Sequence, residues 1–140
     1  MLQIIISLGL AVLICGLALR YGDSPARRIA GAILIAWCAS LLVYQNSARF
    51  TDTGVMIIDG LVAVFFIWES LRSRRLWTVV VAAFQLLALA SHLATVIDHR
   101  VTINTYRLSL AVWSYGILLV LAIAVWRHRR ALRREHLDEA

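Results

Sequence analysis

The chain has 140 residues, of which 61% are hydrophobic, and its mean hydropathy is +0.80. This apolar share exceeds that of ordinary soluble domains, so it predicts an integral membrane protein with no room for a separate soluble catalytic domain. The net charge of +6 comes from arginines at the ends of apolar runs, which favours membrane anchoring and argues against nucleic-acid binding.

Five stretches approach the roughly 20 apolar residues that a membrane helix requires. They predict an all-α integral membrane protein, with one bundle of five transmembrane helices in residues 1–128 and a basic, then acidic, tail in 129–140. The expected helices cover approximately residues 2–20, 25–45, 54–72, 75–98 and 105–128. Because the connections are short, helices that are neighbours in the sequence are expected to pack antiparallel.

The first stretch lacks a positively charged segment before its apolar run and a clear small-residue cleavage site. We therefore expect a retained helix and not a cleaved signal peptide. Small residues recur at four-residue spacing in the first two helices, at Ser7, Ala11, Cys15, Ala32, Ala36 and Ser40. Such stripes let helix backbones approach closely in lipid, so the first two helices are expected to pack against each other. Self-association is the less favoured use of the same stripes.

Residues with capping side chains precede the later helices. Ser24 is expected to cap the second helix, with Pro25 at its first position. Similar start signals are Thr53 for the third helix, Ser73 for the fourth, and Asn104 or Thr105 for the fifth.

The arginines are divided unequally between the two ends of the expected bundle. Eleven lie in the first connection, the third connection and the tail, whereas the other end has only Arg49, Arg100 and Arg107. The positive-inside rule therefore predicts an external N-terminus and a cytoplasmic C-terminus. The chain has no lysine, which indicates a GC-rich genome, so we expect a multi-pass protein of the bacterial inner membrane.

A basic surface is expected at the cytoplasmic end, where the tail extends the fifth helix. Anionic lipid headgroups are its expected partner, and an acidic protein surface is the alternative. Glu69 lies one turn before Arg72 and is expected to form an interfacial ion pair there. The expected interface comprises Glu69, Arg72, Arg74, Arg75, Arg127, Arg129, Arg130, Arg133 and Arg134.

Polar residues deep in the third and fourth helices form the candidate functional site. Gln85 and His92 share one helix face, which we expect to point inward because unpaired polar groups facing hydrocarbon are costly. At 1.5 Å per residue, Asp59 lies about 7 to 8 Å below the outer boundary and His92 about 9 Å below it. The antiparallel pair of helices is therefore expected to bring the carboxylate and the imidazole together.

The expected intramembrane polar cluster comprises Asp59, Gln85, His92, Ser114 and Tyr115, with Trp113 beside them. It is either a structural hydrogen-bonded clasp, which we favour, or a functional site for a proton, an ion or a ligand. Other aromatic residues are expected to form belts at the membrane boundaries, namely Tyr21, Tyr44, Trp68, Trp77, Tyr106 and Trp126.

Common catalytic and cofactor signatures are absent from the sequence, including nucleotide-binding, zinc-protease and serine-hydrolase motifs. Cys15 and Cys38 are far from a CxxC spacing and are expected to be packing residues. His92 is the one histidine well inside a span, so a haem held by two histidines is not expected. The adjacent Asp98, His99 and Arg100 point in different directions. We therefore expect neither a metal nor a cofactor.

Two functions remain in competition. The first is a small non-enzymatic accessory, assembly or scaffolding subunit, which binds another membrane protein or a second copy of itself. The alternative is a small oligomeric transporter or pore, proton-linked in one version, that uses Asp59, His92 and Gln85. An enzyme acting on lipid or quinone is less favoured, because nothing positions a nucleophile, metal or cofactor near the Asp59 and His92 pair.

Overall fold

The computed structural model describes residues 2–46, 51–97 and 103–138. Within these residues the chain is entirely helical, which confirms the prediction of an all-α protein with five helices. The helices are α1 (Leu2–Tyr21), α2 (Ser24–Asn46), α3 (Thr51–Ser73), α4 (Leu76–Ile97) and α5 (Ile103–Asp138).

Within the described ranges, four helices are long and apolar enough to cross a membrane. The qualifying segments are Ser24–Val43, Thr53–Ser73, Leu76–Ile97 and Leu108–Glu135, whereas the apolar segment of α1, Ile6–Tyr21, is shorter. Large apolar side chains cover the outer faces of the bundle, and Leu61 and Val64 are each about two-thirds exposed. Water would not stabilise so much exposed apolar surface, so these helices indicate a membrane protein. The direction of insertion stays a prediction.

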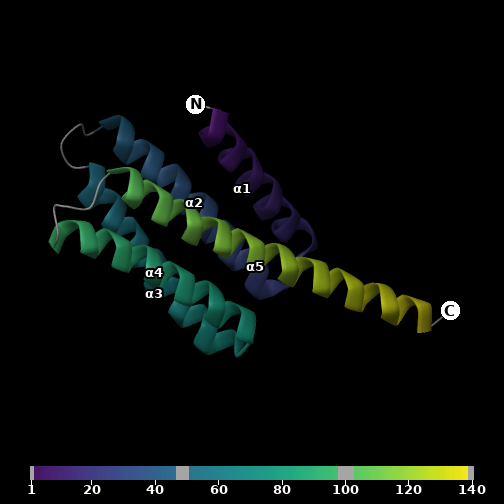
Figure 1. Ribbon diagram of the computed structural model, residues 1–140. Coiled ribbons are helices and arrows are strands. Elements are labelled where there is room, and N and C mark those ends of the chain that lie inside the picture. The colour runs from purple at the N-terminus through teal and green to yellow at the C-terminus, as the bar shows by residue number, and fades with distance from the viewer. Residues whose placement is uncertain (1, 47–50, 98–102, 139–140) are drawn as a thin grey trace.

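The five helices pack as a bundle in which α4 lies between α3 and α5, its most extensive partners (Figure 1). The first helix contacts α2 and α5. Buried apolar side chains from all five helices meet in one core, which includes Cys15, Ala30, Phe66, Val81 and Leu121. The C-terminal part of α5 continues beyond the other helices (Figure 1).

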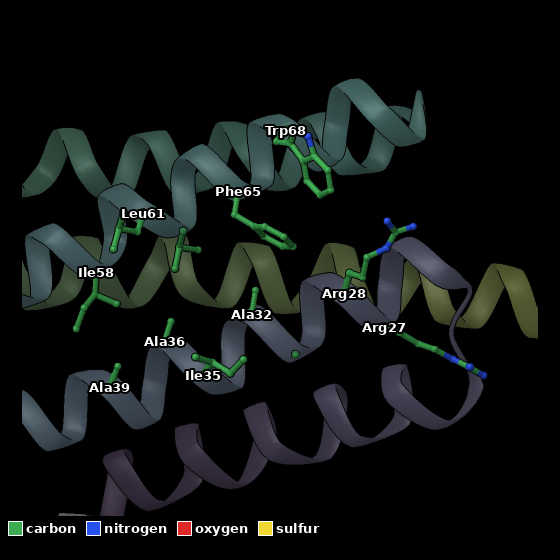
Figure 2. A pocket seen from close by; sticks show the side chains of 12 residues that line it. Arg27, Arg28, Ala32, Ile35, Ala36, Ala39, Ile58, Leu61, Phe65 and Trp68 are labelled. Carbon is green, nitrogen blue, oxygen red and sulfur yellow. The ribbon is translucent and has the colours of Figure 1, made fainter.

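The small-residue stripes of the first two helices have different partners. Ala11 and Cys15 are buried on α1, as expected for a helix that packs closely. Ala32 and Ala36, however, point toward α3 (Figure 2) and line a groove between α2 and α3. The prediction that these two alanines face α1 is therefore wrong, because they lie on a different side of α2 from the buried Ala26 and Ala30.

Asp23, and not Ser24, caps α2. Its Oδ1 accepts a hydrogen bond from the backbone N–H of Ala26 at 3.2 Å, and its carbonyl accepts one from Arg27 at 3.0 Å. Asp and Ser are nearly equal as N-caps, so the sequence alone did not distinguish these neighbours. The Ser24 hydroxyl instead accepts a hydrogen bond from the Arg28 guanidinium at 2.8 Å.

The other predicted helix starts are also wrong. The third and fifth helices begin upstream of the expected caps, at Thr51 and Ile103, and Ser73 is the last residue of α3. Only two residues, Arg74 and Arg75, separate α3 from α4. In so tight a turn the Ser73 hydroxyl bonds the Thr78 hydroxyl at 2.9 Å and does not cap the helix backbone.

Gly22 occupies the close contact between α1 and α2, and its replacement provides a test of this packing. A Cβ added there would lie 2.3 Å from the carbonyl oxygen of Ala18 and 2.9 Å from Cβ of Ala26. Because one clashing atom belongs to the backbone, we expect Gly22→Ala to lower the free energy of unfolding by about 1–3 kcal/mol. Unfolding by SDS in mixed micelles measures this change.

Gly16→Ala is the matched control, because a Cβ at this helical position meets nothing within 4 Å. It should leave stability unchanged or raise it by about 0.5–1 kcal/mol, as alanine favours a helix over glycine. Equal stabilities of the two variants would contradict the described contact.

Candidate functional site

The candidate site lies between α3 and α4. Gln85 and His92 are seven residues apart on α4, so they share the inward face of this helix, and both are buried. Asp59 faces them from α3, with its side chain 24% exposed. The structure therefore brings Asp59 and His92, which helix depth placed at one level, together with Gln85.

Both oxygens of the Asp59 carboxylate accept hydrogen bonds from α4. His92 Nε2 lies 2.8 Å from Oδ2, and Gln85 Nε2 donates to Oδ1 at 3.1 Å. The Gln85 amide also donates to the backbone carbonyl of Asp59 at 3.2 Å. These contacts join the middle of α3 to two turns of α4. An acidic group in an apolar bundle is thus provided with donors at both oxygens.

Tyr106 adds α5 to this cluster. Its hydroxyl lies 2.7 Å from His92 Nδ1, and its ring packs edge-on against the imidazole with the centroids 5.4 Å apart. With the His92 proton on Nε2, that nitrogen donates to Asp59 and Nδ1 accepts from Tyr106. Asp59, Gln85, His92 and Tyr106 therefore form one hydrogen-bonded cluster across three helices, which we name the polar clasp.

Sequence reasoning assigned Tyr106 to the aromatic belt and missed its role in the polar clasp. A usable signal was present, because Tyr106 is near the start of α5 and His92 is near the end of the preceding antiparallel helix. The depth comparison made for Asp59 and His92 also places Tyr106 at nearly the same level. Its phenol has an apolar ring and a polar tip, which suits both a belt and a buried contact.

The remaining predicted cluster residues lie on α5. Ser114 lines a small cavity with Asp59 and Gln85. Tyr115 instead hydrogen-bonds the Ser7 hydroxyl of α1, and Trp113 Nε1 donates to Ser91 Oγ at 3.0 Å. The structure thus places Ser114 beside the polar clasp, whereas Tyr115 links α5 to α1.

Two small cavities adjoin the polar clasp. The first, of about 60 Å³, is lined by Asp59, Gln85 and Ser114 among apolar residues. The second, of about 50 Å³, is lined by His92, Thr95 and Tyr106. Each has room for a water molecule and offers polar partners to it. The Asp59–His92 hydrogen bond therefore connects the linings of the two cavities.

Glu69 does not form the predicted interfacial pair with Arg72. Its side chain is fully buried, and Oε2 lies 3.5 Å from a guanidinium nitrogen of Arg28 on α2. Arg72 instead stacks over the exposed ring of Trp68, at 5.2 Å from its centroid. The physical reason is helical position. Glu69 lies one turn after the buried Phe66, on the inner face of α3, whereas Arg72 lies one turn after the exposed Trp68, on the outer face.

The arginines of the α1–α2 and α3–α4 connections and of the C-terminal part of α5 gather at one end of the bundle, which we name the basic end. Arg75 pairs with Asp23 and thereby joins the α3–α4 turn to the α1–α2 connection. Arg129 stacks on Tyr21 of α1, with its guanidinium carbon 4.3 Å from the ring centroid. Arg130 stacks on Trp126 of its own helix at 4.1 Å. The remaining predicted interface residues, Arg74, Arg127, Arg133 and Arg134, are exposed.

Among the described residues, no group of three or more His, Cys, Asp or Glu side chains is placed to hold a metal ion. The predicted external cap of Asp98, His99 and Arg100 lies outside the described residues, as does Arg49. Comparisons of the chain with protein-family models, curated proteins and solved structures find no match. Functional inference therefore depends on the geometry of the chain itself.

A double-mutant cycle tests whether the polar clasp stabilises the bundle. Asp59→Asn and His92→Ala should each lower the free energy of unfolding by about 1–3 kcal/mol, because each leaves a buried polar partner unpaired. Their effects should overlap by about 0.6 kcal/mol, the average for hydrogen bonds between membrane helices, and by at most about 1.7 kcal/mol. SDS unfolding in mixed micelles gives all four stabilities.

The control cycle combines Asp59→Asn with Ser109→Ala. The Ser109 hydroxyl donates within its own helix, to the carbonyl of Thr105 at 3.0 Å. These two changes should be additive. Additivity in the Asp59 and His92 cycle as well would show that their contact contributes nothing to stability.

Proposed function

We propose that this protein is a non-enzymatic accessory, assembly or scaffolding subunit of the bacterial inner membrane, with its C-terminus in the cytoplasm. The observation that carries the proposal is the exposed, arginine-rich extension of α5 beyond the bundle (Figure 1). In this role the extension docks on an acidic surface of a partner membrane protein, and the apolar helix faces accompany it in the bilayer.

The length of α5 supports a docking role for its C-terminal part. The helix has 36 residues and is therefore about 54 Å long, whereas the hydrocarbon core of a bilayer is about 30 Å thick. From Arg130 to Glu135 every residue is exposed. This segment gains little from packing inside the bundle, and its arginines, including Arg130 on the exposed ring of Trp126, are accessible to acidic groups of a partner.

The polar clasp is also consistent with a non-enzymatic subunit. Both Asp59 oxygens and both His92 ring nitrogens have partners within the bundle. A clasp closed in this way fixes the helices relative to one another and leaves the outer faces of α1, α3 and α4 available for a neighbour. Such fixed faces suit a subunit that supports the assembly of a larger complex.

Neutralising the extension tests the proposed docking. We expect the triple variant Arg130→Gln, Arg133→Gln, Arg134→Gln to lose most of a partner that co-purifies stoichiometrically in mild detergent. Each exposed charge contributes about 0.5 kcal/mol, so three of them together lower the affinity by about tenfold. Quantitative mass spectrometry of native-membrane pull-downs measures the partner.

The corresponding triple lysine variant preserves the charge and should retain the partner, and Arg74→Gln at the α3–α4 turn should have no effect. Recovery of the wild-type chain as a free monomer, without a stoichiometric partner, would contradict the proposal. So would unchanged recovery from the glutamine variant.

A small oligomeric transporter or pore is the second candidate function. The observation in its favour is that the Asp59–His92 hydrogen bond joins two small polar cavities. With a water in each cavity, a proton relay would run through Tyr106, His92 and Asp59 toward Ser114. Each cavity holds only a water-sized species, so within the described bundle a proton is the fitting cargo.

Proton flux into liposomes, followed with a pH-sensitive dye, tests this candidate. If the relay conducts, Asp59→Asn and His92→Ala should each reduce the flux by at least about tenfold, the effect of a barrier higher by about 1.4 kcal/mol. Ser109→Ala should leave the flux unchanged. Equal flux in the wild type, in both variants and in empty liposomes would exclude transport through this cluster.

A further inference from the structure

A groove of about 650 Å³ runs between α2 and α3 on the outside of the bundle. Its walls are almost entirely apolar, with small side chains such as Ala32 and Ala36 on α2 opposite larger ones such as Leu61 and Phe65 on α3 (Figure 2). The groove is open because the small alanine side chains of α2 do not fill the space opposite the bulky residues of α3. No other described element covers this face.

The length of the groove matches one leaflet of a bilayer. It extends along α2 from Arg27 to Ala39, which are 12 residues apart, or about 18 Å at 1.5 Å per residue. Half of a bilayer's hydrocarbon core is about 15 Å thick. A docked transmembrane helix would need a groove across the whole membrane, whereas a lipid chain occupies one leaflet. The length therefore favours a lipid acyl chain over a protein helix.

The charge at one end of the groove identifies the headgroup. The Arg28 guanidinium lies at this end and is about one-third exposed (Figure 2). It donates to the Ser24 carbonyl and hydroxyl, and it lies 3.5 Å from the carboxylate of Glu69. Arg27 also lines the groove, with its Nε donating to the Gly22 carbonyl.

Arg72 stacks on Trp68, a further lining residue at this end. Arg27 and Arg28 line the groove, and Arg72 contacts its lining residue Trp68, whereas Glu69 is the carboxylate that Arg28 contacts. Positive charge is therefore in excess at this end. An exposed tryptophan ring at the same level is typical of the headgroup region. Phosphate is the group that arginine binds best in such a setting.

We propose that the groove between α2 and α3 binds one phospholipid with an anionic headgroup, whose phosphate contacts Arg28 and whose acyl chain lies against Ala36 and Phe65. This lipid differs from the general lipid shell in being held selectively by its headgroup. The groove shares Ala36 and Val62 with the lining of the first cavity beside the polar clasp, but none of its lining residues belongs to the α5 extension. The site therefore stands or falls independently of the proposed function, which rests on that extension.

Photo-crosslinking in nanodiscs tests the proposal. The purified protein is reconstituted with phosphatidylglycerol that carries a diazirine on its acyl chain, or with phosphatidylcholine that carries the same chain. Crosslinked peptides are then mapped by mass spectrometry. We expect groove residues of α2 and α3 to be labelled about fivefold more by the anionic probe, the ratio that about 1 kcal/mol from one arginine provides.

Two substitutions separate the chain site from the headgroup site. Ala32→Phe fills the groove at a position that does not line the cavity beside the polar clasp, and it should abolish the selective labelling. Ala90→Phe, at an exposed position of α4, should leave the labelling intact. Arg28→Gln combined with Glu69→Gln removes the guanidinium proposed to hold the phosphate, without leaving a buried carboxylate unpaired, and it should equalise labelling by the two probes.

Three results would overturn the proposal. The first is equal labelling of the wild type by both probes, and the second is uniform labelling of all lipid-facing helix surfaces. The third is equal loss of selective labelling in Ala32→Phe and Ala90→Phe. If a second protein chain occupied the groove, neither lipid probe would reach its walls. Both probes would then label the groove equally weakly, which is the first result.

Discussion

The Asp59 carboxylate is the constraint on which the arrangement of α3, α4 and α5 depends. In a bilayer, apolar side chains gain little by leaving lipid for protein, so burial alone does not determine which helix faces meet. A carboxylate within the apolar region must find donors, and those donors select the orientation of neighbouring helices. His92 and Gln85 supply them from α4, and Tyr106 extends the cluster to α5. This accounts for the central position of α4 in the bundle.

The basic end is organised by different physics. Its arginines are held by ion pairing with Asp23 and Glu69 and by stacking on Tyr21, Trp68 and Trp126. Aromatic rings provide contact area for the guanidinium planes while the charges remain accessible. The same residue type therefore joins helix connections at one position and presents free charge at another.

These features place three kinds of surface on one small chain. The polar clasp lies inside the bundle, the groove between α2 and α3 lies on its outside, and the α5 extension lies past its end (Figure 1). In the proposed role, the distance between the groove and the extension lets the chain hold a lipid and a protein partner at once without competition between them.

Hydropathy and helical periodicity were sufficient for the five helices, the antiparallel order and the inward face of α4, since these depend on composition and on the 3.6-residue repeat. The same local arithmetic placed Asp59 and His92 at one level. Helical spacing did not predict the partner of Glu69, because Glu69 and Arg72 are one turn apart on α3 and the pairing of Glu69 depends on a residue of α2. Arg28 of α2 decides that pairing, and residue spacing along α3 contains no information about it.

By itself, the sequence determined that this chain forms apolar helices, where its charges gather, and which polar residues must turn inward. Only the tertiary structure decided that Tyr106 completes the polar clasp, that Asp23 caps α2, and that Ala32 and Ala36 open a groove instead of closing a helix contact. The physical reason is that each of these outcomes depends on the rotation of one helix relative to another. That rotation is set by contacts between residues distant in sequence, which a single periodic pattern does not specify.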